Sequence, residues 1–329
     1  MKPTSTAETV IESHEVHWSS RIAFPILAAL LFVTQASIGF GVYRNNYWLA
    51  VPLVLISSHL MHGMVIGFHE ATHGLLRKNR LLNEIDGLII GTLSLMSFSL
   101  YRAAHQLHHA YLASERDEEL WPFVHPQISR GARVGAAILE LTMGLLFTPF
   151  LFMRTFLRRG SPIRNKKLRR RIWTEFAAAA VVWTGIFTAV AVFDAWKYFL
   201  WLHLIPAWLA ANMQSLRKYV EHVGLTGSTV NGSTRSIVAK GCVADFFNFT
   251  LLNEPYHGVH HWRSGLRHSE LPEHTYALEP VVEQERPPFR SFGAALHDLL
   301  SNLADPRVGA QWLGVARTTR QERAKQGLI

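Results

Sequence analysis

Residues 47–73 read YWLAVPLVLISSHLMHGMVIGFHEATH. The part from 47 to 68 contains no Asp, Glu, Lys or Arg. A helix of about 20 apolar residues is long enough to cross the hydrocarbon core of a bilayer. The stretch ends with His69 and His73, which are four residues apart and therefore share one face of a helix. It predicts a membrane-spanning helix with two imidazoles at one end that can reach the same metal ion.

Three further apolar runs lie on either side of this stretch, at residues 22–42, 176–193 and 198–216. Each is long enough to predict a membrane-spanning helix, and Pro206 predicts a kink in the last of them. The whole chain is 49% hydrophobic and only 17% charged, whereas soluble proteins average about 25% charged residues. The composition therefore agrees with several membrane spans.

Two shorter or interrupted apolar runs are interpreted differently. The run at residues 85–100 is short and rich in Gly and Ser, so we expect a buried or interfacial segment. Residues 134–153 contain Glu140, and we expect them to lie in, or dip into, the cytoplasmic interface of the membrane. The predicted fold class is an all-α integral membrane protein with about four transmembrane helices and a cytoplasmic helical cap.

Basic residues set the expected orientation. The loop after residue 153 carries basic residues only, namely Arg154, Arg158, Arg159, Arg164, Lys166, Lys167, Arg169, Arg170 and Arg171. Short loops rich in Lys and Arg stay in the cytoplasm, so four spans place both termini there as well. Since this loop sits between apolar segments, the net charge of +9 is attributed to topology and contact with anionic lipid. Nucleic acid is not expected as a partner.

The chain divides into three expected regions. Residues 1–20 form a polar cytoplasmic tail without the basic-then-apolar order of a secretory signal. Residues 21–262 form the membrane domain, and residues 263–329 form a polar cytoplasmic tail with an amphipathic helix at 292–303. The single cysteine, Cys242, excludes a disulfide framework and a cysteine-based zinc site.

Nine histidines stand out by their spacing and position. Two have the HxxxH pattern, two triplets have the HxxHH pattern, and one follows the last span: His69, His73; His105, His108, His109; His257, His260, His261; and His222. Positions i, i+3 and i+4 share a helical face, and all nine fall at the cytoplasmic side of the expected topology. Nine donors are too many for one ion, and they fit two ions with four or five ligands each.

The donor type narrows the choice of metal. Imidazole suits Zn, Cu, Fe and Ni, but a structural zinc site is closed, four-coordinate and usually rich in Cys. Iron is preferred, because activation of O₂ beside a membrane can cleave an unactivated C–H bond of a lipid-soluble molecule. His59 and His62 lie inside a predicted span. Either they form hydrogen bonds that support the metal site or line a substrate tunnel, or they are core histidines with a packing role only. The others are expected to be non-ligands: His14, His17, His125, His203, His268, His274 and His297.

The three boxes, in this order and with these spans between them, resemble the membrane fatty acid desaturase family over residues 23–262. That family also uses a histidine shortly after the fourth span, matched by His222, and many members hold a metal through water with an Asn four residues before the last box, matched by Asn253. The resemblance implies two Fe ions held by these ten residues. It implies neither a catalytic residue separate from the metal ligands nor a further cofactor.

The resemblance implies an O₂-dependent oxidoreductase acting on a lipid acyl chain, most simply a desaturase. No cytochrome b5-like domain is apparent, so electrons are expected from an external carrier such as ferredoxin. Hydroxylation or ketolation of a lipid, carotenoid or other hydrophobic substrate stays open, as does a membrane metal-handling protein, although transporters place ligands near the bilayer midplane. The short turns between spans favour a bacterial inner membrane.

Overall fold

The computed structural model describes residues 18–283 and 285–314. Within them the regular elements are helices, apart from an isolated β-bridge between Ile237 and Phe289. Most of the expected N-terminal tail, with His14 and His17, lies outside the described residues, as does the end of the C-terminal tail.

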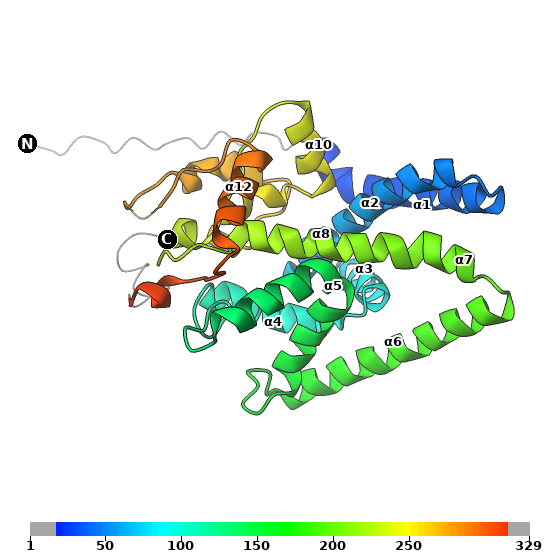
Figure 1. Cartoon of the computed structure of the whole chain (residues 1–329), viewed down its shortest axis with the longest axis horizontal. Helices are drawn as coiled ribbons and strands as arrows, with labels where there is room; N and C mark the ends of the chain where they lie inside the picture. The colour runs from blue at the N-terminus through cyan, green and yellow to red at the C-terminus, as the bar shows by residue number, and fades with distance from the viewer. Residues whose placement is uncertain (1–17, 284, 315–329) are drawn as a thin grey trace, which may run out of the picture.

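Four long helical arms form one end of the molecule. They comprise α1 (Trp18–Tyr43), α2 (Tyr47–His73), α6 (Lys166–Val192) and a continuous rod made of α7 (Trp196–Phe199), the π-helical turn η1 (Leu200–Leu204) and α8 (Ile205–His222). Between the arms and the cap lie α3 (Arg80–Leu93), α4 (Phe98–Tyr111) and α5 (Arg130–Leu157). Figure 1 shows α1, α2 and the rod side by side, with α6 returning from the tip of the rod.

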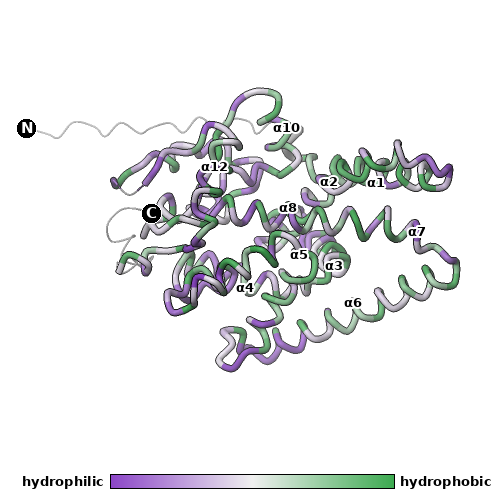
Figure 2. The backbone as a smooth tube through the Cα atoms, viewed as in Figure 1, coloured by the Kyte–Doolittle hydropathy of each residue, from purple (hydrophilic) through white to green (hydrophobic). Residues whose placement is uncertain are grey.

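The other end of the molecule is a cap of short elements. These are α9 (Val230–Ser233), α10 (Cys242–Thr250), η2 (Glu254–Tyr256), α11 (His257–Trp262), η3 (Leu271–Leu278), α12 (Phe292–Asn302) and η4 (Ala310–Leu313). The helix predicted at 292–303 is confirmed as α12. Leu299 and Val308 pack against Tyr219 of α8, so this part of the expected C-terminal tail belongs to the packed cap. In Figure 2, hydrophobic residues predominate in the arms and hydrophilic residues in the cap.

Local sequence explains how the first hairpin forms. The Asn46 side chain accepts a hydrogen bond from the backbone N–H of Leu49 and caps α2, and Gly74 ends the helix in the left-handed conformation, at φ 77°. Gly67 lies directly against the ring of Phe24 in α1, where a Cβ atom has no space. Close contact between α1 and α2 therefore depends on a glycine two residues before the first histidine box.

By length and composition, four helices are apolar enough to cross a membrane: α1, α2, α5 and α6. The predicted number is the same, but one member differs. Residues 198–216 are not among them, because a π-helical turn divides the run and the α8 helix that follows contains the charged residues Arg217, Lys218 and Glu221. Residues 134–153 form most of α5, and their expected place at the membrane interface stays a prediction. Glu140 of α5 pairs with Lys218 of α8, and the helix is kinked nearby, at Met143.

The kink expected at Pro206 takes another form. The backbone remains helical there, and the irregularity is the π-helical turn η1 just before the proline. Proline lacks the N–H that a regular helix uses at each position, and a local π-helical turn is one way to accommodate this.

The run at residues 85–100 is divided between α3 and α4, whose axes meet at 101°. It therefore forms an elbow and no single straight span. The carboxylate of Glu175 in α6 fixes this elbow, since it accepts hydrogen bonds from the hydroxyls of Ser97 and Ser99 at 2.7 and 2.5 Å. Beneath the cap, the apolar core gathers around Phe68, Phe98 and Phe152.

Candidate metal centre

Histidine side chains from four elements meet where the arms join the cap. The first box ends α2, the second box lies on α4, His222 ends α8, and the third box forms α11. Within each box the helical spacing turns the imidazoles to the same side. Segments up to about 190 residues apart in the chain thus deliver their nitrogens to one place.

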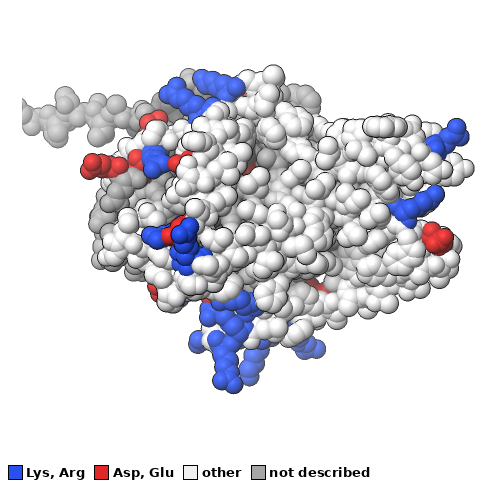
Figure 3. Space-filling model, in the orientation of Figure 1, with Lys and Arg blue, Asp and Glu red and all other residues white. Residues whose placement is uncertain are grey.

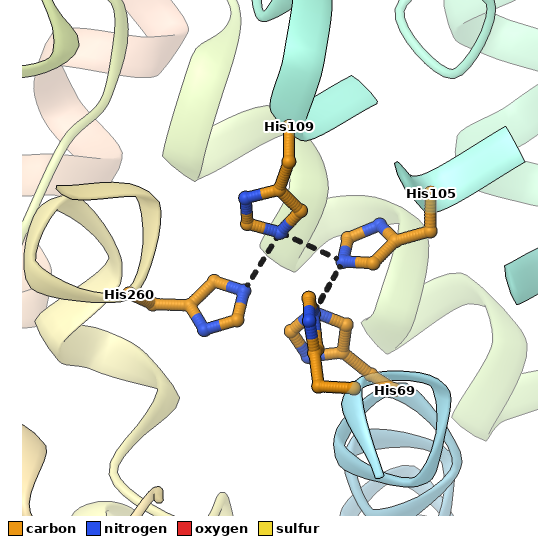
Figure 4. Close-up of side chains that lie close together, drawn as sticks. His69, His105, His109 and His260 are labelled. Carbon is orange, nitrogen blue, oxygen red and sulfur yellow. Dashed lines mark hydrogen bonds between the residues drawn. The ribbon is translucent and has the colours of Figure 1, made fainter. Parts of the chain in front are cut away.

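The first group contains five imidazoles. The Nε2 atom of His105 lies 2.7, 3.1 and 3.0 Å from the Nε2 atoms of His69, His73 and His109. His260 joins through its Nε2 atom, 3.0 Å from that of His109. Figure 4 shows His69, His105, His109 and His260 pointing at a common centre from three separate elements. These five form a group with the spacing expected of metal ligands.

The second group contains the remaining four imidazoles. The Nε2 atom of His261 lies 3.0 Å from that of His257 and 3.3 Å from that of His108. The Nε2 atoms of His257 and His222 are 2.9 Å apart. All nine sequence-predicted histidines therefore lie together, in one set of five and one of four, and their binding of metal stays a prediction.

The hydrogen bonds of His222 and His257 indicate whether a cation fits between the two rings. The Nδ1 atom of His222 lies 3.1 Å from the carbonyl oxygen of Ser233, which can only accept, so Nδ1 carries the proton. The Nδ1 atom of His257 lies 3.0 Å from a carboxylate oxygen of Glu254. When both rings are neutral, each Nε2 atom points its lone pair at the Nε2 atom of the other ring, and the two atoms are 2.9 Å apart. Such lone pairs repel one another unless a cation lies beside them, and this donor set fits a metal ion.

A proton is a poor substitute for that cation. Burial lowers the pKa of His257 to about 4 and lowers the pKa of His222 well below its usual value. In the first group, burial likewise lowers the pKa of His105, His109 and His260. Burial therefore favours the neutral form of these five imidazoles, which is the form that binds metals.

A layer of carboxylates surrounds the histidines. Glu119 holds Nδ1 of His105 at 2.9 Å, and Asp117 holds Nδ1 of His108 at 2.9 Å. Such partners fix the ring orientation and the tautomer of a metal-binding histidine. Neither carboxylate is among the sequence-predicted site residues. The acidic residues shortly after the second box were the only available signal.

Glu254 connects the two groups. One of its oxygens lies 3.0 Å from Nδ1 of His257 and the other 3.3 Å from Nδ1 of His69. The guanidinium of Arg217 contacts both Glu254, at 2.6 Å, and Glu221, at 2.5 Å. Burial alone would raise the pKa of Glu254, but His69 and Arg217 hold it well below its usual value. A buried, charged pair thus supports both sets of imidazoles.

The remaining residues singled out in the sequence are Asn253 and the histidines outside the nine. Asn253 has a left-handed backbone, with φ 56°, and its Nδ2 atom donates to the carbonyl of His268 at 2.9 Å. Its role as a water-mediated ligand stays a prediction. His59 contacts Thr250 Oγ1 at 2.8 Å, and His62 is buried. Among the described residues, the histidines expected to be non-ligands lie outside both groups: His125, His203, His268, His274 and His297.

A mainly apolar cavity of about 230 Å³ lies under the histidines, between α2, α3, α5 and α8. Its wall includes Phe68, Tyr101 and Glu119 at the end nearest the metal groups. The ring of Tyr101 stacks on that of His105, with centroids 5.5 Å apart. One aromatic side chain therefore separates the cavity from a predicted ligand.

Comparison with known proteins gives an independent finding. The model of the family described as fatty acid desaturase matches residues 46–293. An omega-3 fatty acid desaturase, chloroplastic, from Brassica napus is 26% identical over 303 residues, covering 84% of this chain and 71% of the relative. The sn-2 acyl-lipid omega-3 desaturase (ferredoxin), chloroplastic, from Arabidopsis thaliana is 25% identical over 305 residues, covering 84% of this chain and 65% of the relative.

Proposed function

Because this chain belongs to the fatty acid desaturase family, we propose that it is an O₂-dependent membrane oxidoreductase that introduces a double bond into a lipid acyl chain. The observation that carries the proposal is the pair of facing Nε2 atoms of His222 and His257, 2.9 Å apart, within nine converging imidazoles. This arrangement supports a resident pair of metal ions beside an apolar cavity.

We propose iron as the metal. His69, His73, His105, His109 and His260 would hold one ion, and His108, His222, His257 and His261 the other, with Asn253 contributing through water. Iron bound there would supply the activation of O₂ and the cleavage of an aliphatic C–H bond. The two methylene hydrogens, two further electrons and two protons reduce one O₂ to two waters. One relative is named with ferredoxin, which supports an external one-electron carrier of this kind as the donor.

The chain's own residues position and protect the reaction. Glu119, Asp117 and Glu254 keep Nδ1 protonated on the histidines they contact, so that Nε2 faces inward. The apolar cavity wall orients a hydrocarbon chain and excludes water from it. Phe68 and Tyr101 are the wall residues beside the first and second histidine boxes.

Two other functions use some of the same features. Hydroxylation or ketolation needs the same donors, and the desaturase names of the relatives favour loss of hydrogen over addition of oxygen. A metal-handling protein needs ligands that can release the ion. Here six of the nine histidines are buried, and carboxylates hold His105 and His108, which supports a resident cofactor.

We expect the purified protein, loaded anaerobically, to bind close to two irons per chain. Cells that express it should contain membrane lipids with two hydrogens fewer per modified acyl chain, detected by mass spectrometry of intact lipids. His109→Ala should remove the product, since alanine offers no nitrogen ligand. One iron or none in the wild-type protein contradicts the di-iron assignment, and products that gain oxygen favour the hydroxylase.

We propose that α1, α2, α6 and the rod of residues 196–216 cross the membrane and that α5 lies at its cytoplasmic side. Trp48, which is 94% exposed, Tyr43 and Trp196 ring the far tips of the arms, as interfacial aromatics do. The division into a tail (1–20), a membrane domain (21–262) and a second tail (263–329), both tails cytoplasmic, follows this topology. A bacterial inner membrane is the proposed location, and cell fractionation tests it, because the names of the relatives place those proteins in chloroplasts.

Reporter fusions test the orientation. Fusions after Ile329 and within residues 164–171 should both report the cytoplasm, because the basic loop resists translocation. A fusion in the turn at residues 43–46 serves as the control and should report the opposite side. A non-cytoplasmic signal from either of the first two contradicts the four-span topology.

A further inference from the structure

Two aromatic side chains lead from the third histidine box to the surface of the cap. Trp262 is the last residue of α11 and follows His261 directly, so one peptide bond joins it to a predicted ligand. The centroid of its ring lies 5.9 Å from that of Tyr276, which is 62% exposed. The ring of His274 lies beside both, at 6.3 Å from Trp262 and 5.8 Å from Tyr276. We call Trp262 and Tyr276 the aromatic row.

Packing between α11 and η3 holds the row. Val259 of α11 shares an apolar core with Leu271 and Leu278 of η3, which keeps the indole and the phenol on facing elements. The Nδ1 atom of His274 lies 3.0 Å from the carbonyl oxygen of Glu270 and therefore carries the proton. The spacing of the rings is thus a property of the packed cap.

The aromatic side chain at the first metal group has different neighbours. Tyr101 stacks on His105, and its other ring neighbours among the described residues are Phe68 and Phe152. Phenylalanine holds its electrons far more tightly than tyrosine or tryptophan does, and Tyr101 is only 7% exposed. An electron removed from Tyr101 is therefore not replaced through these rings, whereas the aromatic row continues to solvent.

The chemistry of the two rings decides the direction in which electrons move. Indole and phenol give up one electron to a strong oxidant, but neither accepts an electron from a reductant of the ferredoxin class. The row therefore suits the removal of oxidising equivalents from a site at which O₂ is reduced. The guanidinium of Arg263 lies 5.8 Å from the ring of Trp262 and disfavours a positive charge on the indole. It thereby favours onward transfer to Tyr276, since an oxidised phenol releases its proton and is left uncharged.

The outer end of the row lies where a soluble reductant can reach it. In Figure 3, charged side chains lie over the cap, at the start of α6 and at the tips of the arms, and the flanks of the arms between them are mostly white. With the arms in the membrane, as proposed above, a water-soluble carrier meets the protein at the cap. Tyr276 is one of the exposed residues there.

We infer that the aromatic row protects the metal centre by supplying it with single electrons when O₂ is reduced without an acyl chain. The indole of Trp262 gives one electron to the oxidised site, and the phenol of Tyr276 replaces that electron and releases a proton to water. The external carrier and water then return an electron and a proton to the tyrosyl radical. This inference rests on the proposed function and adds a protective activity to it.

The electrons and protons balance without the substrate. Two passages along the row supply the two electrons that the methylene hydrogens would otherwise give. Two further electrons come from the external carrier, and four protons come from water. One O₂ is therefore still reduced to two waters, and the oxidising equivalents end on Tyr276 instead of on side chains of the interior.

Electron paramagnetic resonance tests the row without lipid turnover. The full-length, iron-loaded protein is reduced, mixed with O₂ in detergent without a lipid substrate, and frozen. We expect a tyrosyl signal that narrows when the protein contains ring-deuterated tyrosine. Tyr276→Phe should lose this signal, and so should Trp262→Phe, because Tyr276 is then disconnected from the site. Tyr43→Phe is the matched control, since Tyr43 is 68% exposed at the far end of α1, and should keep the signal.

The conservative variant separates electron transfer from a packing role. Trp262→Tyr again provides an oxidisable ring and should recover the signal that Trp262→Phe loses. A tyrosyl signal that survives Tyr276→Phe, or that Tyr101→Phe removes instead, overturns the inference. So does a wild-type protein that holds iron and consumes O₂ but gives no signal. A wild-type protein without iron overturns the proposed function together with the inference, whereas a signal at Tyr276 without any lipid product contradicts the proposed function alone.

Peptide mapping by mass spectrometry gives a second readout, after repeated cycles of reduction and exposure to O₂. In Tyr276→Phe, the oxidising equivalents should be consumed in the interior and convert the cavity-wall residues Met61 and Met64 to sulfoxides. The wild-type protein and Tyr43→Phe should keep both methionines reduced. Equal oxidation of these methionines in the three proteins overturns the protective role.

Discussion

Replacing His105 by alanine should abolish acyl-chain oxidation and lower the iron content of the purified protein. The Nε2 atom of His105 lies within 3.1 Å of three other Nε2 atoms, more than any other imidazole in the two groups. Alanine supplies no nitrogen, so the loss should exceed the roughly 10–100-fold effect that is typical of residues supporting a ligand from behind. Iron analysis and lipid mass spectrometry on the same preparation measure both effects.

His268→Ala is the matched control for this change. His268 is also buried, but it lies outside both groups of imidazoles. Its backbone carbonyl accepts a hydrogen bond from the side chain of Asn253. That backbone contact survives the substitution, so iron and activity should be retained. If His268→Ala loses iron as completely as His105→Ala, the assignment of the nine ligands is wrong.

Replacing Arg217 by methionine should give the second large effect. The substitution leaves the carboxylates of Glu221 and Glu254 buried without their cation. Removing one member of a buried ion pair typically costs about 3–5 kcal/mol. Since Glu254 contacts His69 and His257, iron should be lost from both groups. Thermal unfolding in detergent and iron analysis measure the two effects separately.

Two further variants show whether this effect comes from the buried charge. Arg286→Met removes an exposed contact with Asp298 and should cost no more than about 1 kcal/mol. The double variant Arg217→Met with Glu254→Gln removes a buried negative charge as well and should recover much of the stability while still binding iron poorly. An Arg217→Met protein as stable as wild type contradicts the supporting role.

The fold was largely predictable because apolar length is a local property of the chain. The spans at 22–42, 47–68 and 176–193 correspond to α1, α2 and α6. The difference concerns α5, which is long and apolar enough to cross a membrane although it contains Glu140. Its partner Lys218 lies 78 residues away, and no local pattern shows that the two charges neutralise each other.

The histidine groups were predictable for a similar reason. Spacing of three and four residues within each box fixes which imidazoles share a helical face, and all nine meet as expected. The supporting residues escaped prediction because each acts through a tertiary contact. Glu119 reaches His105 across a turn, and Arg217 reaches Glu254 from another helix. A charged residue near a histidine box looks the same in sequence whether it faces water or a ligand.

The elbow between α3 and α4 has a consequence for how the protein can diversify. The helix α3 carries the cavity residues Ile89 and Leu93, and α4 carries the second histidine box. The joint is held by Glu175 and by close packing at Gly91, where an added Cβ would lie 2.7 Å from the carbonyl oxygen of Met96. Substitutions at the cavity residues of α3 can alter what the cavity accepts while the arrangement of the histidines on α4 persists. Selectivity and reactivity are thus separately evolvable in this scaffold.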